Sequence, residues 1–246
     1  MRIDDGLHLI MSGGGGFDLT DRFDCNVFLV KAGTRWLMFD AGAGRDSEAV
    51  AAVLAGDGIA PTAIGHIFLT HAHADHSGGA AMWRARSGAA VHAGARTAAL
   101  VASGDESAIS LDRARKAGVY PEDYRYQACP VDHVLAADET VRIGDCAIRM
   151  IETPGHARDH VSYLVETPVR TLLIAGDALF QGGKVAIQDI ADCDVAATCA
   201  TIRKLAALDF DALLPGHLAF SLRNGRRHAD AALGYVDRLL CPPSII

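Results

Sequence analysis

The sequence has no apolar run of the roughly 20 residues that a membrane-spanning helix needs. Its first residues, Met1 to Asp5, carry acids where a secretion signal carries bases. The six cysteines are scattered and include no Cys-x-x-Cys pair, which argues against a disulfide framework and a thiolate zinc site. We therefore predict a cytoplasmic protein with free thiols and no membrane partner.

Positive charge is also scarce, with 23 Lys and Arg against 30 Asp and Glu and a formal net charge of -7. A surface that binds phosphate backbones normally has a clustered excess of basic residues, so we predict no nucleic-acid partner. The 246 residues are 50% hydrophobic, which is enough to bury one large core. We expect a single domain over residues 1–246.

Short apolar segments rich in β-branched residues alternate with alanine-rich stretches, a pattern that predicts an α/β (α+β) fold class. The expected strands are Leu7–Met11, Asn26–Lys31, Arg35–Asp40, His66–Thr70, Ala89–His92, Thr140–Ile143, Cys146–Glu152, Val161–Glu166, Thr171–Ala175 and Ala212–Leu214. The expected helices are Ser47–Ala55, Gly79–Ser87, Ala95–Ala102, Ile109–Ala117, Val195–Leu208 and Arg226–Leu240. Leu233, Val236 and Leu239 of the last helix are candidates for burial against the domain or in a homodimer.

The chemistry concentrates directly after the strand predicted at residues 66–70, in the run His71-Ala72-His73-Ala74-Asp75-His76. A buried strand delivers the loop that follows it to one fixed place. Imidazole nitrogen and carboxylate oxygen are ligands that zinc accepts, and packing alone gives no reason to gather them here. The run therefore predicts a divalent metal site.

One loop cannot supply all the ligands of two metal ions, and three further candidates stand in similar settings. His156, Asp177 and His217 each follow an apolar run and come directly after a glycine. The glycine permits a sharp backbone turn at the strand end. We expect these three side chains to complete the metal site.

These motifs resemble the metallo-β-lactamase superfamily, whose His-x-His-x-Asp-His hallmark corresponds to residues 71–76. The resemblance covers almost the whole chain and implies a four-layer αββα sandwich of two mixed sheets with outer helices. It also implies two divalent ions per chain, Zn²⁺ first, with Mn or Fe as alternatives. By this analogy His71, His73 and His156 bind one ion, Asp75, His76 and His217 bind the second, and Asp177 bridges them.

The mechanism follows from metal chemistry, because a hydroxide held between two dications is available near neutral pH. Asp75 and Asp177 are the predicted catalytic carboxylates, and Asp75 would orient the nucleophile and pass a proton to the leaving group. Asp40 and His160 are predicted to hold the metal-binding imidazoles in the right tautomer.

The ligand set resembles the glyoxalase II, lactonase and phosphodiesterase branches rather than a true β-lactamase, which lacks the bridging Asp177. The segments 153–163 and 176–180 resemble glyoxalase II, but the residues after His217 are too few for its glutathione-binding helical domain.

Substrate contacts are predicted from the same comparison. Acyl-homoserine lactonases carry a catalytic tyrosine at the position of Phe180. A lactonase would then need another donor, such as Tyr120 or Tyr124 from the segment between residues 95 and 135, which would form part of a lid. Lys184 is a candidate for binding a substrate carboxylate or phosphate.

The predicted function is a binuclear metal-dependent hydrolase that cleaves a carbonyl ester, lactone or thioester of a small molecule. One alternative is a mononuclear iron persulfide dioxygenase that uses only His71, His156 and Asp177. The other is a phosphodiesterase of the same superfamily.

Overall fold

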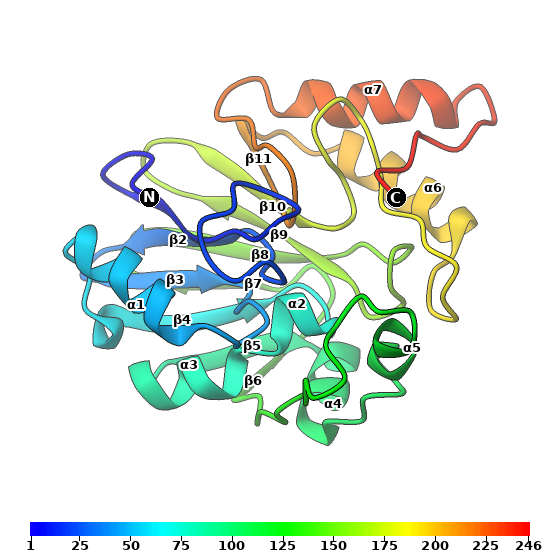
Figure 1. Cartoon of the computed structure of the whole chain (residues 1–246). Coiled ribbons are helices and arrows are strands. Elements are labelled where there is room, and N and C mark those ends of the chain that lie inside the picture. The colour runs from blue at the N-terminus through cyan, green and yellow to red at the C-terminus, as the bar shows by residue number, and fades with distance from the viewer. The chain divides into compact units, whose positions relative to one another are not determined.

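The computed structural model describes residues 1–246 and divides into two compact units, Met1–Leu135 and Ala136–Ile246. Each unit contains one mixed β-sheet with accompanying helices, as Figure 1 shows. The α/β class and the two mixed sheets predicted from the sequence are thereby confirmed. No helix combines the length and the apolar character that crossing a bilayer requires.

The sheet of the first unit has six strands in the order β1-β2-β3-β4-β5-β6. The first three pair antiparallel, whereas β3, β4, β5 and β6 pair parallel. The strands are β1 (Leu7–Met11), β2 (Val27–Ala32), β3 (Arg35–Phe39), β4 (Ile64–Leu69), β5 (Ala90–Gly94) and β6 (His133–Leu135). Because β3 and β4 are parallel, the residues that follow them emerge at the same edge of the sheet.

The helices of this unit are α1 (Ser47–Gly56), α2 (Ala74–Ser77), α3 (Ala80–Ser87), α4 (Ala95–Ser103) and α5 (Leu111–Lys116), with a 3₁₀ turn at Pro61–Ala63. The Asp46 carboxylate caps α1 by accepting from the Ala49 amide. Leu54 of α1 and Trp83 of α3 join Ile67 of β4 in one buried apolar cluster. Helices α1 and α3 therefore cover the same face of this sheet (Figure 1).

The sheet of the second unit has five strands in the order β11-β10-β9-β8-β7, of which only β10 and β11 pair parallel. Its elements are β7 (Thr140–Ile143), β8 (Cys146–Glu152), β9 (Val161–Glu166), β10 (Thr171–Gly176), α6 (Val195–Ala206), β11 (Ala212–Pro215) and α7 (Arg226–Val236). Ile202 of α6 and Ala229 of α7 pack with Leu173 of β10 in a second apolar cluster. Helices α6 and α7 therefore bury their apolar stripes against this sheet.

All ten predicted strands form, but β6, α2 and the 3₁₀ turn Pro61–Ala63 were not predicted. Strand β6 has only three residues, too few to show an alternating pattern, and helix α2 lies inside a run that was expected to be a loop. The last helix ends at Val236 rather than at Leu240, and Leu239 beyond it is 91% exposed, so Leu239 is not buried against the domain. The single domain over residues 1–246 stays a prediction.

Candidate metal centre

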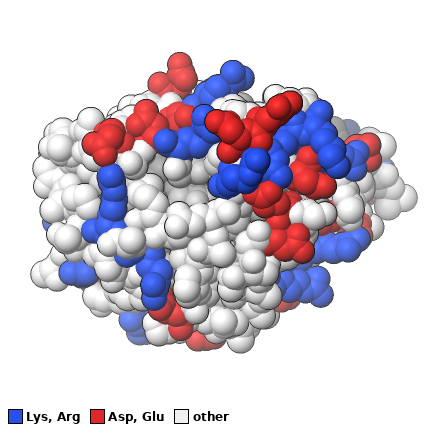
Figure 2. All heavy atoms as spheres, turned by 60° about the horizontal axis from the view of Figure 1, so that its bottom comes forward, with Lys and Arg blue, Asp and Glu red and all other residues white.

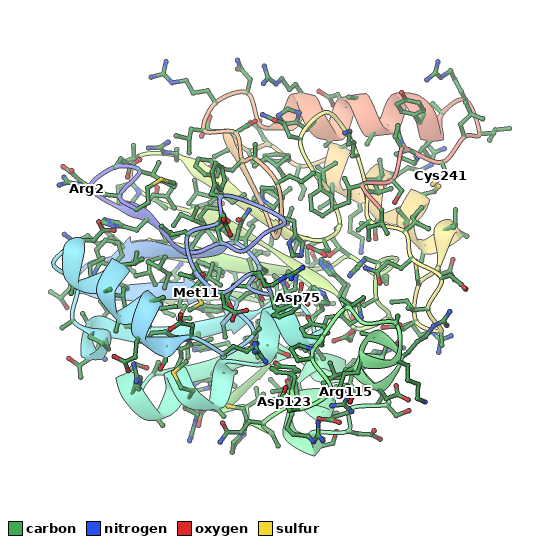
Figure 3. All side chains as sticks on the ribbon, viewed as in Figure 1. Arg2, Met11, Asp75, Arg115, Asp123 and Cys241 are labelled. Atoms are coloured by element: carbon green, nitrogen blue, oxygen red, sulfur yellow. The ribbon has the colours of Figure 1, made fainter.

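The segment 71–76 follows β4 at the edge where the parallel strands end. Helix α2 begins at Ala74 with His73 as its N-terminal cap, so Asp75 lies in the first turn of that helix. Figure 3 labels Asp75 beside α2. The ring centroid of His71 lies 4.6 Å from that of His73 and 4.1 Å from that of His76. The loop therefore gathers three imidazoles, and Oδ2 of Asp75 lies 3.5 Å from Nε2 of His76.

Asp40 determines which nitrogen carries the proton in two of these rings. Its Oδ2 lies 2.8 Å from Nδ1 of His76, and because a carboxylate can only accept, this Nδ1 donates. The Thr70 hydroxyl donates to Asp40, and its oxygen then accepts from Nδ1 of His71 at 3.0 Å. In both rings Nε2 is the unprotonated nitrogen, the form that binds a metal ion.

The position of Asp40 results from an uncommon backbone conformation. Asp40 follows β3 with φ of +61°, a region that Asp tolerates better than most residues. Its amide donates to the Phe68 carbonyl, and the Ala41 amide donates to the His76 carbonyl. The ends of β3 and α2 are thereby joined around the carboxylate. The predicted role of Asp40 agrees with this geometry, whereas the role of Thr70 was missed, although it directly precedes His71.

A cysteine that sequence reasoning treated only as a free thiol also belongs to this cluster. The ligand atoms of Cys25, Asp40 and His76 all lie within 4.8 Å of one another, and all three residues are buried. Burial raises the pKa of the Cys25 thiol to about 12, partly opposed by its hydrogen bond with His76. Without a bound metal ion the thiol is therefore protonated near neutral pH, next to His76.

In the second unit, Asp177 lies between two imidazoles. Its Oδ2 is 3.5 Å from Nε2 of His156 and 3.5 Å from Nε2 of His217. Nδ1 of His156 donates to the Ala186 carbonyl at 3.2 Å, which leaves Nε2 unprotonated and directed at Asp177. A carboxylate between two imidazole nitrogens has the arrangement that a bridging ligand of two metal ions requires.

Close packing requires a glycine directly before His156. Gly155 adopts φ of +144°, and a Cβ there would collide with Thr198 of α6. The Asp194 amide donates to the Gly155 carbonyl, so the start of α6 holds this turn in place. The sharp turn that the sequence predicted before His156 is thus formed by close approach to a helix.

His160 has a hydrogen-bonding role that the sequence did not predict. Its Nε2 accepts from the backbone amide of Asp177 at 2.9 Å, so Nδ1 carries the proton and donates to the Thr153 hydroxyl at 2.8 Å. The His156 and His160 rings are 6.2 Å apart. His160 therefore fixes the main chain of Asp177.

Of the two tyrosines predicted to contact substrate, Tyr120 lies next to Asp75. Its hydroxyl hydrogen-bonds to the Asp75 carboxylate, and burial raises its pKa well above the ordinary value of 10.0. The ring stacks between Phe23 at 5.1 Å and Tyr124 at 5.1 Å. The Tyr124 hydroxyl instead donates to the Ala43 carbonyl at 2.8 Å. Tyr120 is therefore a neutral donor directed at Asp75, whereas Tyr124 ties the segment to the strand edge.

The two other predicted substrate residues lie on the turn after Asp177. Phe180 is completely buried, and its amide donates to the Lys184 carbonyl at 2.8 Å. Lys184 is exposed. The aromatic ring of Phe180 is therefore part of the buried interior rather than of an open surface.

The donors present fit a divalent metal ion. They are imidazoles and carboxylates, and at least three of the imidazoles have Nε2 as the unprotonated nitrogen because a carboxylate, hydroxyl or carbonyl takes the proton on Nδ1. Zinc binds neutral imidazole nitrogen and carboxylate oxygen, and its ligating histidines are commonly held in this way.

Among curated proteins, the chain is 32% identical over 200 residues to a hydroxyacylglutathione hydrolase of Acidiphilium cryptum, covering 79% of this chain and 68% of that one. It is 31% identical over 117 residues to a hydroxyacylglutathione hydrolase of Rhodopseudomonas palustris, covering 48% and 34%. It is 27% identical to a thioesterase of Emericella nidulans, covering 78% and 45%. The matches thus span between about a third and two thirds of these relatives' lengths.

Solved structures show the same fold. The subclass B3 metallo-β-lactamase of Bradyrhizobium japonicum aligns with a TM-score of 0.72 at 21% identity and covers 97% of this chain and 91% of that one. The sequence model of the metallo-beta-lactamase superfamily matches residues 20–217, a range that contains every predicted ligand. The chain therefore belongs to the metallo-β-lactamase superfamily.

Proposed function

We propose that this protein hydrolyses the acyl C–S or C–O bond of a small molecule, with a thioester as the first choice and an ester or lactone as related substrates. The observation that carries the proposal is the Asp177 carboxylate, placed 3.5 Å from the Nε2 atoms of both His156 and His217. A carboxylate in this position can be shared by two adjacent metal ions, which is the arrangement that the proposed binuclear hydrolase would use.

The proposed ligands are the seven residues predicted from the sequence. One group of ligands lies in residues 71–76, the other consists of His156, Asp177 and His217, and the two groups act together. The family match from residue 20 to 217 supports this, because it runs through both groups. It also supports treating the chain as one domain. The metal ligands are His71, His73 and His156 for one ion, Asp75, His76 and His217 for the other, and Asp177 for both. When bound, two divalent ions supply Lewis acidity and a water whose pKa is near neutral.

Asp75 is the proposed proton acceptor. It lies in the first turn of α2, and its carboxylate is 3.5 Å from Nε2 of His76. A carboxylate there accepts the proton of the attacking water and returns it to the leaving group. The neutral Tyr120 hydroxyl donates to Asp75 and orients it, which is the role that we assign to this tyrosine.

The thioester preference rests on the relatives. The curated relatives carry the names hydroxyacylglutathione hydrolase and thioesterase, and the β-lactamase neighbours are similar only in fold. On the face seen in Figure 2, acidic and basic side chains are intermixed, which supports a small-molecule substrate over a polyanion. The cytoplasmic location and the homodimer stay predictions.

Elemental analysis of the purified protein and a turnover panel test the proposal. We expect two divalent ions per chain and the fastest turnover with thioesters, weaker turnover with lactones and little with a β-lactam. One iron per chain without hydrolysis would favour the persulfide dioxygenase. A clear preference for phosphodiesters would replace the carbonyl assignment with a phosphodiesterase.

A further inference from the structure

A second histidine cluster lies within the parallel strands of the first unit. His66, His92 and His133 lie on the neighbouring strands β4, β5 and β6. His92 is in register with His133 across β5 and β6. Ile67 and Val91 face the helix-covered side, so strand alternation places His66 and His92 on the opposite face.

The central ring, His92, contacts the rings of both His66 and His133. Nδ1 of His66 lies 3.0 Å from Nε2 of His92. The His92 and His133 rings stack with centroids 4.6 Å apart and planes 22° apart, and Phe68 stacks on His92 at 4.4 Å. His92 is 5% exposed, whereas His133 is open to solvent. The cluster is therefore buried at its centre and accessible at one end.

The chemistry of these rings suits a metal ion. Burial lowers the pKa of His92 to about 4 and also lowers the pKa of His66, so both imidazoles are neutral at neutral pH. Nδ1 of the buried His92 has no hydrogen-bond partner, so the ring is not locked by a second hydrogen bond. Two imidazole nitrogens bound to one tetrahedral zinc ion at 2.0–2.1 Å are about 3.3 Å apart, close to the contact seen here.

The carboxylate beside the cluster, Asp132, interacts electrostatically with His92 and His133 but is already engaged by other groups. Asp132 precedes His133, and its oxygens are taken by the Arg84 guanidinium at 2.8 and 3.2 Å and by the Val91 amide at 2.9 Å. An ion bound by this cluster must therefore be one that imidazole nitrogens can coordinate without a carboxylate, such as a borderline transition-metal ion.

We propose that His66, His92 and His133 form a third metal site, separate from the residue 71–76 loop, that binds Zn²⁺. The ion takes the place of the hydrogen bond between His66 and His92. The exposed His133 side chain turns to supply the third nitrogen, since exposed side chains change rotamer freely. The bound ion links β4, β5 and β6, and the site binds zinc more weakly than one whose imidazoles are anchored by carboxylates.

Zinc titration of the full chain tests this site. The protein is first loaded at its tight sites and then equilibrated with micromolar free zinc, and bound metal is measured by elemental analysis. We expect one more zinc ion per chain in the wild type than in His133→Gln and His66→Gln. The matched control is Val134→Gln, which changes the neighbouring exposed residue of β6 and keeps the additional ion.

A second measurement locates the ion. Long-range nitrogen-proton NMR spectra of the imidazoles should show the nitrogens of His66, His92 and His133 shifting in the weak phase of the titration. An additional ion that persists in both variants, or no additional ion in the wild type, would overturn the proposal. Turnover should be unchanged in His133→Gln, so failure of the third site and failure of the proposed hydrolase are separate results.

Discussion

Two histidine clusters of the first unit are built around the same strand and are held in different ways. At the end of β4, His71 and His76 are fixed by the Asp40 carboxylate, directly or through Thr70. Within the strands, His92 is held by stacking on Phe68 and by one contact with His66. A carboxylate raises the basicity of an imidazole and fixes its tautomer, whereas apolar burial only keeps it neutral.

The comparison shows why grouped histidines are not equivalent. The anchored cluster is prepared for tight metal binding before any ion arrives, because its proton positions are already set. The stacked cluster must turn His133 and exchange a hydrogen bond before it binds an ion. We therefore expect large functional effects at the first cluster and small ones at the second.

The largest effect is expected from His73→Ala, which removes a proposed metal ligand. The loss of several kcal/mol of transition-state stabilisation corresponds to a turnover decrease of about 10³-fold or more. Thioester turnover and bound metal should fall together while the circular dichroism spectrum is retained. Full activity in this variant would refute the metal centre, and His133→Gln is the matched histidine control.

Asp40→Asn is expected to be the next largest change. Its amide nitrogen can donate to Nδ1 of His76, which would move the imidazole proton to Nε2 and remove the ligand nitrogen. Loss of a side chain that hydrogen-bonds to a metal ligand usually lowers metal affinity or activity by about 10- to 100-fold. Competition with a zinc chelator measures the affinity, and an unchanged value would show that Asp40 is only structural.

A smaller effect is expected from Tyr120→Phe. The ring stack with Phe23 and Tyr124 remains, and only the hydrogen bond to Asp75 is lost. One hydrogen bond of about 1 kcal/mol corresponds to a decrease of roughly fivefold, which should appear in kcat.

Tyr124→Phe is the matched control for this tyrosine. It removes the hydrogen bond to the Ala43 carbonyl, so it should lower Tm and leave kcat nearly unchanged. Equal kcat values in the wild type and Tyr120→Phe would remove the role assigned to that hydroxyl.

The smallest effect on turnover is expected from His92→Phe, which should change the pH dependence of stability. The pKa of His92 is about 4 in the folded protein and 6.5 ordinarily, so the unfolded chain binds more protons between these values. Stability should therefore be lost as pH falls from about 6.5 towards 4, by up to roughly 3 kcal/mol. Urea unfolding of chelator-treated protein should show a flatter pH profile in His92→Phe, and parallel profiles would contradict the assignment.

Much of the fold could be predicted because strands with alternating or continuous apolar residues end at clear turns. Gly144 and Asp145, for example, separate β7 from β8, and both strands have the predicted bounds. Strand β6 was missed because three residues form a strand only by pairing with β5. Helix α2 was not predicted because its residues were interpreted as metal ligands in a loop. Their helical backbone conformation was not considered.

The types and the order of the candidate ligands could be predicted from the amino-acid order alone, because the grouped His and Asp residues after apolar strands have no packing explanation. Tertiary structure alone decided which partner takes each imidazole proton, that His160 holds the Asp177 amide, and that Tyr120 rather than Tyr124 is directed at Asp75. The physical reason is that a hydrogen bond depends on distance and direction between side chains far apart in the chain, and these quantities exist only after the strands have paired.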